Sequence, residues 1–253
     1  MSEMEPITVE IKPLTPIWTG DANRKCKTLK ESGIIGSLRW WYEAVIRGYG
    51  GTACNPTETD CDKGKHCDAC ELFGCTGWSR KFRFEIEGSG EIIKLKFKPL
   101  REIDDVEWAL LNKTLTIIAN YGAIGGKIAE WQYGLIEIKS SELENYKLNK
   151  NDLENYFKKR GSSVDNPDIS NFFFVNRPDG GKTKDLKDEC EFLKGQGPRV
   201  AKRYFYKTKN GKPYRYFAYA KDSSEFEKIK KFLNSRKIEY LEGSVVLRPE
   251  GGQ

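Results

Sequence analysis

The sequence predicts an α+β protein made of two units, and three observations lead to this class. Runs in which apolar and polar residues alternate, as they do in half-buried strands, occur in both halves of the chain. Stretches with apolar residues at helical spacing separate these runs. The chain has 253 residues, which is enough to bury two hydrophobic cores.

The first half contains a complete set of predicted elements. In chain order they are a strand at 7–14, a helix within 34–50, a hairpin of strands at 81–87 and 91–98, a helix at 104–118 and a strand at 134–139. The order strand, helix, hairpin, helix, strand is that of ferredoxin-like (RRM-like) domains. We therefore expect one complete unit of this fold over residues 1–140.

The second half predicts a partial or degenerate copy of the same unit over residues 141–253. Residues 141–160 fit a helix, 172–175 a buried strand, 204–220 a hairpin around Asn210-Gly211, 224–237 a helix with a capping pair at Ser224 and Glu227, and 244–248 a closing strand. The Asn-Gly pair is the strongest short hairpin signal in the chain.

Charge and hydropathy restrict the partners of the protein. There are 43 lysines and arginines against 37 acidic residues, which gives a net charge of +6. A polyanion would therefore need a local cluster of cations. No apolar run approaches the 18 residues of a membrane helix, and the N-terminus lacks the basic and apolar regions of a secretory signal. We expect a cytoplasmic protein that does not contact a membrane.

A cysteine-rich insertion at about 50–78 predicts a metal site. Five of the seven cysteines fall within 22 residues. In a reducing compartment such a cluster is more often a metal site than a disulfide framework. The expected ligands of a closed, structural zinc are Cys54, Cys61, Cys67 and Cys70, in which the last two form a chelating knuckle.

Alternatives remain for the ligand set. His66 or Cys75 could replace one of the four cysteines, and Cys75, within the apolar LFGCTGW, also fits a buried core position. Without a metal, the cluster would be a set of reduced thiols. His66 is the only histidine and lies inside the insertion. The chain therefore has no other histidine that could act as the base for a nucleophile elsewhere. We therefore expect a protein that is not an enzyme.

Two basic stretches suggest nucleic-acid binding. Between Glu191 and Asp222 there is no acidic residue, while lysines and arginines alternate with tyrosines and phenylalanines. Phosphate neutralisation combined with base stacking is what single-stranded nucleic acid requires. An amphipathic hairpin with aromatic residues in the core would give the same pattern. The loop at 24–30 is also basic, and GAIGGK at 122–127 lacks the Lys-Ser/Thr ending of a P-loop.

Several motifs together resemble a known family. The motifs, in order, are PLTPIWTG, GSLRWWYEAVIRG, CDACELFGCTGWSRKFRFEI and YGAIGGKIAEWQYGLIEI, which span about residues 7–140. They resemble the RAMP superfamily of CRISPR proteins, and within it the family of the first-numbered Cmr subunit of type III-B effector complexes. The resemblance implies ferredoxin-like units, a Gly-rich loop before the last strand of a unit, and a place near the crRNA 3′ end.

The resemblance also implies a set of RNA-binding residues. They are Trp18 and the basic residues after it, Arg24, Lys25 and Lys27, then Arg39 and Trp40 of the LRWW helix, and Gly125, Gly126 and Lys127 of the Gly-rich loop. In the family this loop continues with Arg and Gly-Phe-Gly. Here it reads KIAEWQYG, with Glu130 where a cation would suit RNA.

The expected function is that of a non-catalytic RNA-binding subunit in antiviral defence. Its partners would be crRNA, target RNA and other Cmr subunits, with no small-molecule substrate. Two alternatives are a RAMP endoribonuclease, which could cut RNA with a carboxylate and cations in place of histidine, and an assembly module whose cysteine-rich segment docks a neighbouring subunit.

Overall fold

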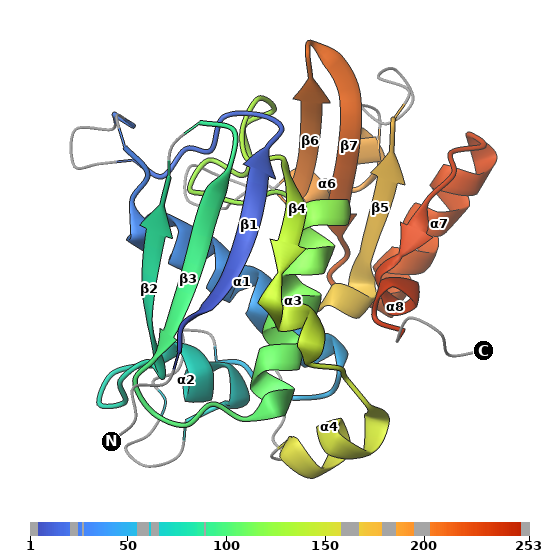
Figure 1. Cartoon of the computed structure of the whole chain (residues 1–253). Helices are drawn as coiled ribbons and strands as arrows, with labels where there is room; N and C mark the ends of the chain where they lie inside the picture. The colour runs from blue at the N-terminus through green and yellow to red at the C-terminus, as the bar shows by residue number, and fades with distance from the viewer. Residues whose placement is uncertain are drawn as a thin grey trace.

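Two four-stranded antiparallel sheets lie side by side in this computed structural model (Figure 1). The structure describes residues 5–20, 25–26, 28–54, 61, 66–88, 90–157, 167–178, 186–194 and 203–248. We refer to the described residues up to 157 as the first unit and to those from 167 as the second unit.

The first unit has the predicted ferredoxin-like topology. Its elements are β1 (Ile7–Pro13), α1 (Glu31–Gly48), α2 (Asp68–Phe73), β2 (Phe82–Glu87), β3 (Ile93–Pro99), α3 (Asp105–Asn120) and β4 (Ile136–Ser141). The strand order is β2-β3-β1-β4, and every neighbouring pair is antiparallel. Helix α2 is an addition to the ferredoxin-like order and lies in the cysteine-rich insertion between α1 and β2.

Local sequence explains both long helices of the first unit. Helix α1 buries Ile34, Leu38 and Trp41 at the predicted helical spacing. Helix α3 begins at Asp104, whose side chain accepts a hydrogen bond from the backbone N–H of Val106, and a capping box with Glu107 completes the start. Both helices contribute to the core on one face of the sheet.

The segment after β4 differs from the single predicted helix. It forms a short 3₁₀ helix, η1 (Glu142–Asn145), and a separate helix α4 (Lys150–Tyr156). The helix restarts because the side chain of Asn149 caps it, accepting from the N–H of Asp152 at 2.8 Å. The ring of Tyr146 lies 6.0 Å from that of Trp108 on α3, so this segment packs against the first unit.

The second unit repeats the strand order of the first. Its elements are η2 (Ile169–Asn171), β5 (Phe172–Asn176), α5 (Leu186–Glu189), α6 (Glu191–Lys194), β6 (Tyr204–Lys209), β7 (Lys212–Tyr219), α7 (Ser223–Ser235), β8 (Leu241–Glu242) and α8 (Gly243–Val246). The order β6-β7-β5-β8 corresponds position by position to β2-β3-β1-β4. The copy is reduced, as predicted, because two four-residue helices replace the first long helix and the last strand has two residues.

Two predictions for the second unit were wrong in detail. The cap of α7 is Asp222, which accepts from the N–H of Glu225, so the capping pair lies two residues before the predicted one. Residues 244–248 do not form a strand, because helix α8 begins at Gly243, where a Cβ would collide with the carbonyl of Ile169. A short apolar run cannot distinguish a strand from a buried helical turn.

An aromatic seam joins the two units. We use this name for Trp40, Trp41, Phe172, Phe205, Phe217 and Tyr219. Trp41 of α1 is fully buried, with ring centroids 5.6 Å from Phe172 and 5.4 Å from Phe217. These second-unit aromatics belong to the same core as the first sheet, whereas the other face of the second sheet packs on α7 in a smaller core. Burial on both faces explains the uninterrupted FFFV run.

Two buried cations add polar links across the seam. Lys207 on β6 donates from Nζ to the carbonyls of Glu130 and Tyr133, at 2.7 and 2.8 Å. Its partner across the hairpin, Arg215 on β7, donates to carbonyls at the end of α3. Burial lowers the pKa of Lys207 to about 7. Part of the basic and aromatic pattern of this hairpin therefore serves the contact between the units.

The seam makes Trp41 a sensitive position for stability. We expect Trp41→Ala to lower the free energy of unfolding by about 3–5 kcal/mol, because it leaves a cavity between both units and removes the Nε1 bond to the carbonyl of Ala123. Urea denaturation followed by circular dichroism measures this. Leu100→Ala, at a side chain that is 61% exposed, is the control and should change stability by less than about 0.5 kcal/mol. Equal effects of the two substitutions would contradict the claim that the aromatic seam stabilises the protein.

Candidate metal centre and nucleic-acid interface

The structure brings the four predicted metal ligands together. The sulfur atoms of Cys54, Cys61, Cys67 and Cys70 all lie within 4.8 Å of one another. The Sγ of Cys70 is 3.5 Å from that of Cys54 and 3.6 Å from that of Cys61. Four sulfurs around a tetrahedral zinc, at about 2.3 Å from the ion, are about 3.8 Å apart. The cluster therefore has the ligand type, number and spacing of a structural zinc site.

Helix α2 creates the knuckle of this cluster. Cys67 is its N-cap, and the Cys67 Sγ accepts hydrogen bonds from the backbone N–H groups of Cys70 and Cys54, at 3.4 and 3.2 Å. Hydrogen bonds from the Cys54 and Cys70 thiols lower the pKa of Cys67, and the bond with Cys67 raises the pKa of Cys54 to about 12. The surroundings of Cys67 therefore favour its thiolate, which is the form that binds a metal.

A polar stripe on α1 holds the cluster. It consists of Arg39, Glu43 and Arg47, which are one helical turn apart. Arg39 donates from Nη2 to the Cys70 Sγ at 3.2 Å and from Nη1 to the Gly74 carbonyl at 2.7 Å. Its Nε pairs with Glu43 at 2.8 Å. Burial opposes the charge of Arg39, but the bonds with Glu43 and Cys70 outweigh it and raise the pKa.

Arg47 extends the stripe to the other end of the cluster. It is buried, and it donates to the carbonyls of Ala53 and Cys54 at 3.1 and 3.4 Å. Four thiolates on a divalent ion carry a net charge of −2, which the two guanidinium groups beside them offset in part, since Glu43 is paired with Arg39. Glu43 and Arg47 were not predicted as site residues. The available signal was their spacing of four and eight residues from Arg39.

The two alternative ligands are not members of the four-sulfur set, although burial and the nearby Cys61 thiol raise the pKa of Cys75. His66 pairs through Nε2 with Glu71 and stacks on Trp78, with ring centroids 4.2 Å apart. Cys75 forms a backbone bridge with Trp78 in the turn after α2 and is half-buried, so it is not the core residue that was considered. Among the described residues, the four-sulfur set contains neither of them.

The predicted Gly-rich loop and the TPIWTG segment also meet. The N–H of Gly126 donates to the carbonyl of Trp18 at 2.7 Å, and that of Gly134 donates to Pro16 at 3.0 Å. The Lys127 ammonium lies 4.7 Å from the centre of the Trp18 ring and 5.6 Å from that of Tyr133. We call Trp18, Lys127 and Tyr133 the Lys127 clasp. It places a cation beside two half-buried aromatic rings.

Close backbone packing explains the first glycine of the loop. Gly125 is buried and has φ +112°, and a Cβ there would lie 2.7 Å from the Trp18 carbonyl. Gly126 is exposed, with its N–H already bonded to Trp18. Gly125 thus allows the backbones of the loop and of the TPIWTG segment to approach each other. The groups available to a ligand are the side chains of the Lys127 clasp.

The remaining predicted RNA contacts have different surroundings. The three donor nitrogens of Arg39 bond inside the protein, and Trp40 packs in the aromatic seam, 6.0 Å from Phe205. The structure therefore favours structural roles for both residues over the predicted phosphate and base contacts. Lys25 is exposed, while Arg24 and Lys27 lie outside the described residues.

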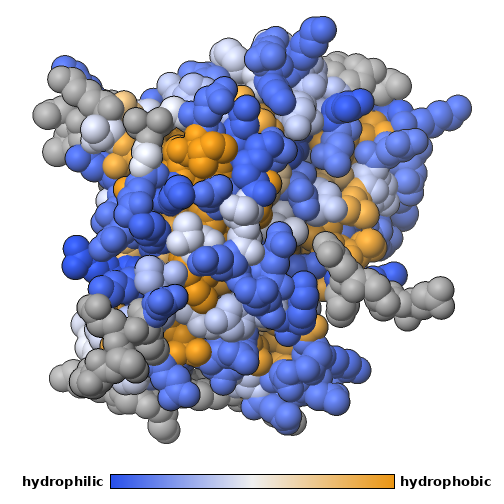
Figure 2. All heavy atoms as spheres, viewed as in Figure 1, coloured by the Kyte–Doolittle hydropathy of each residue, from blue (hydrophilic) through white to orange (hydrophobic). Residues whose placement is uncertain are grey.

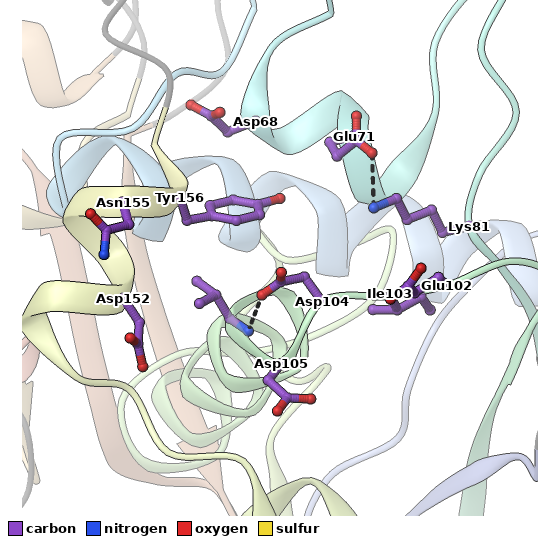
Figure 3. A pocket seen from close by; sticks show the side chains of 11 residues that line it. Asp68, Glu71, Lys81, Glu102, Ile103, Asp104, Asp105, Asp152, Asn155 and Tyr156 are labelled. Atoms are coloured by element: carbon purple, nitrogen blue, oxygen red, sulfur yellow. Dashed lines mark hydrogen bonds and ion pairs between the residues drawn. The ribbon is translucent and has the colours of Figure 1, made fainter.

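A hollow beside the cysteine cluster has the wrong charge for RNA. It has a volume of about 860 Å³ and lies between α2, the start of α3 and α4. Figure 3 shows its carboxylates, among them Asp68, Asp104 and Asp152, arranged around the opening, with Lys81 paired to Glu71. Six carboxylates and one lysine would repel a phosphate backbone. A nucleic-acid interface is therefore expected at the other end of the first unit, around the clasp.

Comparison with known proteins identifies the family. Residues 10–137 match the model of the RAMP superfamily, which is about half of the chain. The chain belongs to the RAMP superfamily. No curated protein matches the sequence. The matched range of this RAMP protein includes the Lys127 clasp, the cysteine cluster and the α1 stripe, and it ends before the second unit.

The fold of this RAMP protein resembles a solved structure over nearly its whole length. The crystal structure of Cmr1 from Pyrococcus furiosus, in its apo form, superposes with a TM-score of 0.53 at 12% sequence identity. The match covers 95% of this chain and 99% of that chain. Both units therefore have counterparts in that fold.

In Figure 2 the visible face is mostly hydrophilic, and its apolar residues form separate patches. Within the described part of the chain, no helix has the length and hydropathy needed to cross a membrane.

The cluster predicts the metal content of the protein. We expect one zinc per chain by elemental analysis, and we expect Cys70→Ser to lose it because Cys70 is in contact with two other ligands. Cys75→Ser is the matched control and should keep the metal. Loss of zinc in the Cys75 variant, or full zinc in the Cys70 variant, would refute this ligand set.

The contact between Arg39 and Cys70 gives a separate prediction. We expect Arg39→Ala to weaken zinc affinity by roughly 10- to 100-fold, as the loss of a group that orients a ligand usually does. Competition with a chromophoric chelator measures the affinity. Arg83→Ala, on an exposed side chain of β2, should leave it unchanged. At saturating zinc, Arg39→Ala should bind RNA as tightly as the unmodified protein. A loss of RNA binding under these conditions would instead support the phosphate contact first predicted for Arg39.

Proposed function

We propose that this chain is a non-catalytic RNA-binding subunit of a type III-B CRISPR (Cmr) effector complex. The observation that carries the proposal is the Lys127 clasp, in which two of the four sequence motifs of the resemblance form one surface with a cation over aromatic rings. Membership of the RAMP superfamily and the similarity in fold to Cmr1 support it.

The chemistry of the clasp suits a single strand. An ammonium group neutralises a phosphate, and tryptophan and tyrosine rings stack on unpaired bases without regard to sequence. The loop that carries Lys127 is fixed at both ends by backbone hydrogen bonds to residues 16 and 18, so little conformational entropy is lost when a strand binds. A rigid loop with a cation and aromatic rings is therefore a good platform for crRNA or target RNA.

The proposed lack of catalysis rests on the surroundings of the titratable groups. His66 is held between Glu71 and Trp78, beside the proposed metal centre, which leaves it badly placed to act on RNA. The carboxylates of the acidic hollow lie where phosphate is repelled. The acidic hollow and the Lys127 clasp lie at opposite ends of the first unit, so we propose that RNA binds at the clasp and not at the hollow.

Zinc is the proposed resident ion, with a structural role. Four thiolates leave no open coordination position, and an ion at this site would tie the insertion to α1. Other Cmr subunits are the proposed protein partners, and crRNA near its 3′ end and target RNA are the proposed nucleic acids. The proposed location is the cytoplasm, where these RNAs occur.

RNA binding and its dependence on Lys127 test the proposal. We expect labelled single-stranded RNA to bind in fluorescence anisotropy, with affinity falling as salt rises, and Lys127→Ala to weaken binding and reduce the salt slope by about 0.7. Lys231→Ala removes an exposed lysine from α7 and is the control.

The RNA recovered after incubation, with and without Mg²⁺, should have its original length. Cleavage that persists through purification would favour the endoribonuclease. Absence of binding both for the isolated chain and for the chain assembled with its partner subunits would contradict the proposed function.

A further inference from the structure

A second basic surface lies where the two units meet. A cleft of about 760 Å³ is lined by the end of α3, the start of β4, the end of β5 and the β6–β7 hairpin. The arrowheads of β1, β5 and β6 point towards the same end of the molecule, at the top of Figure 1, and the hairpin turn lies at that end. The cleft therefore opens near the Gly-rich loop, away from the cysteine cluster.

The cleft contains a buried guanidinium that has no anionic partner in the part of the chain that the structure describes. Arg215 is 4% exposed, and its Nη1 and Nη2 atoms donate to the carbonyls of Gly122 and Ala119, at 2.7 and 2.9 Å. Its Nε is buried and has no hydrogen-bond partner within the described residues. Burial lowers the pKa of Arg215 to about 10, which shows that its charge is poorly compensated. An anion in the cleft would supply the missing compensation.

Other cations line the cleft close to Arg215. The Lys209 ammonium lies 5.2 Å from the centre of the Tyr214 ring, and Arg215 lies on the same ring at 5.5 Å. Arg177 has φ +49° and is held by a hydrogen bond from its N–H to the Tyr214 carbonyl, at 2.9 Å. Two carboxylates, Glu137 and Glu144, also line the cleft, and Glu137 is paired with Lys139 at 2.8 Å. The cations exceed the carboxylates in number.

An exposed tryptophan lies on the loop whose backbone bonds to the residue before Lys209. Trp131 is 54% exposed, which is unusual for so large an apolar side chain. Its carbonyl accepts from the N–H of Thr208, the residue before Lys209, at 3.0 Å. On both sides of Trp131 the buried Lys207 ammonium bonds the carbonyls of Glu130 and Tyr133. The second unit thus holds this loop in a conformation that leaves the indole in solvent.

We propose that this cleft binds single-stranded RNA, with Lys209 contacting a phosphate group close to the buried charge of Arg215 and Trp131 stacking on a base. The inference rests on the proposed function and assigns it a second contact region, which the hairpin and the Gly-rich loop form together. Lys207 is a positioning residue for Trp131. The arrangement gives both parts of single-strand recognition, a phosphate site and an adjacent aromatic platform.

The test compares two lysines of one hairpin. Lys209 and Lys212 face each other in the register of β6 and β7, but only Lys209 lines the cleft. In fluorescence anisotropy with labelled oligouridylate, Lys209→Ala should reduce the salt slope by about 0.7, while Lys212→Ala should keep the original slope. Trp131→Ala should weaken binding by roughly 5- to 150-fold, and Trp131→Phe should restore part of it.

Inorganic phosphate provides a readout that does not depend on RNA. Without RNA, phosphate should raise the melting temperature of the full chain, and Lys209→Ala should reduce that shift more than Lys212→Ala does. If RNA binds but Lys209, Lys212 and Trp131 variants behave alike, the inference is wrong and the proposed function stands. If phosphate stabilises the chain through Lys209 but RNA does not bind, the ligand is a free phosphate and RNA is excluded. Tighter binding of polyglutamate than of RNA would instead indicate an acidic protein segment.

Discussion

The packing of Trp41 between the two sheets is the interaction on which the other features depend. Its ring contacts Phe172 and Phe217 of the second unit, while its indole N–H bonds the carbonyl of Ala123 at the start of the Gly-rich loop. One side chain of α1 therefore fixes both the second sheet and the loop. With the units held at this spacing, Lys207 and Arg215 can reach carbonyls of the first unit. Burying two cations is costly, and the large apolar area of the seam makes that cost tolerable.

Helix α1 also separates the two kinds of chemistry in the molecule. Its apolar face forms the seam, and its polar stripe of Arg39, Glu43 and Arg47 holds the cysteine cluster. The acidic hollow lies next to this cluster, whereas the Lys127 clasp and the cleft lie towards the opposite end of the strands. A polyanion is therefore repelled at one end and attracted at the other. A metal centre in the insertion would make the first end rigid without taking part in the binding of RNA.

Local patterns in the sequence predict most elements because their causes are local. Alternation in β1 and β3, the cap at Asp104 and the Asn210-Gly211 turn each depend on neighbouring residues. The cysteine cluster could also be predicted, since ligand type and spacing determine what four thiols can hold. The roles of Arg39 and Trp40 could not, because they depend on which segments pack on α1 from elsewhere in the chain. For the same reason the sequence of the basic hairpin fitted nucleic-acid binding and an amphipathic hairpin equally well. In the structure Lys207 and Arg215 face inward, whereas Lys212 faces solvent.

The central claim is that RNA contacts the end of the molecule formed by the Gly-rich loop and the hairpin. Photo-crosslinking of the full chain to 4-thiouridine RNA, followed by mass spectrometry of the linked peptides, measures this directly. The account predicts cross-links within residues 126–133 and 209–215, and no cross-links within residues 66–78 of the cysteine-rich segment. Cross-links confined to residues 66–78 or to the acidic hollow at 102–106 would contradict it.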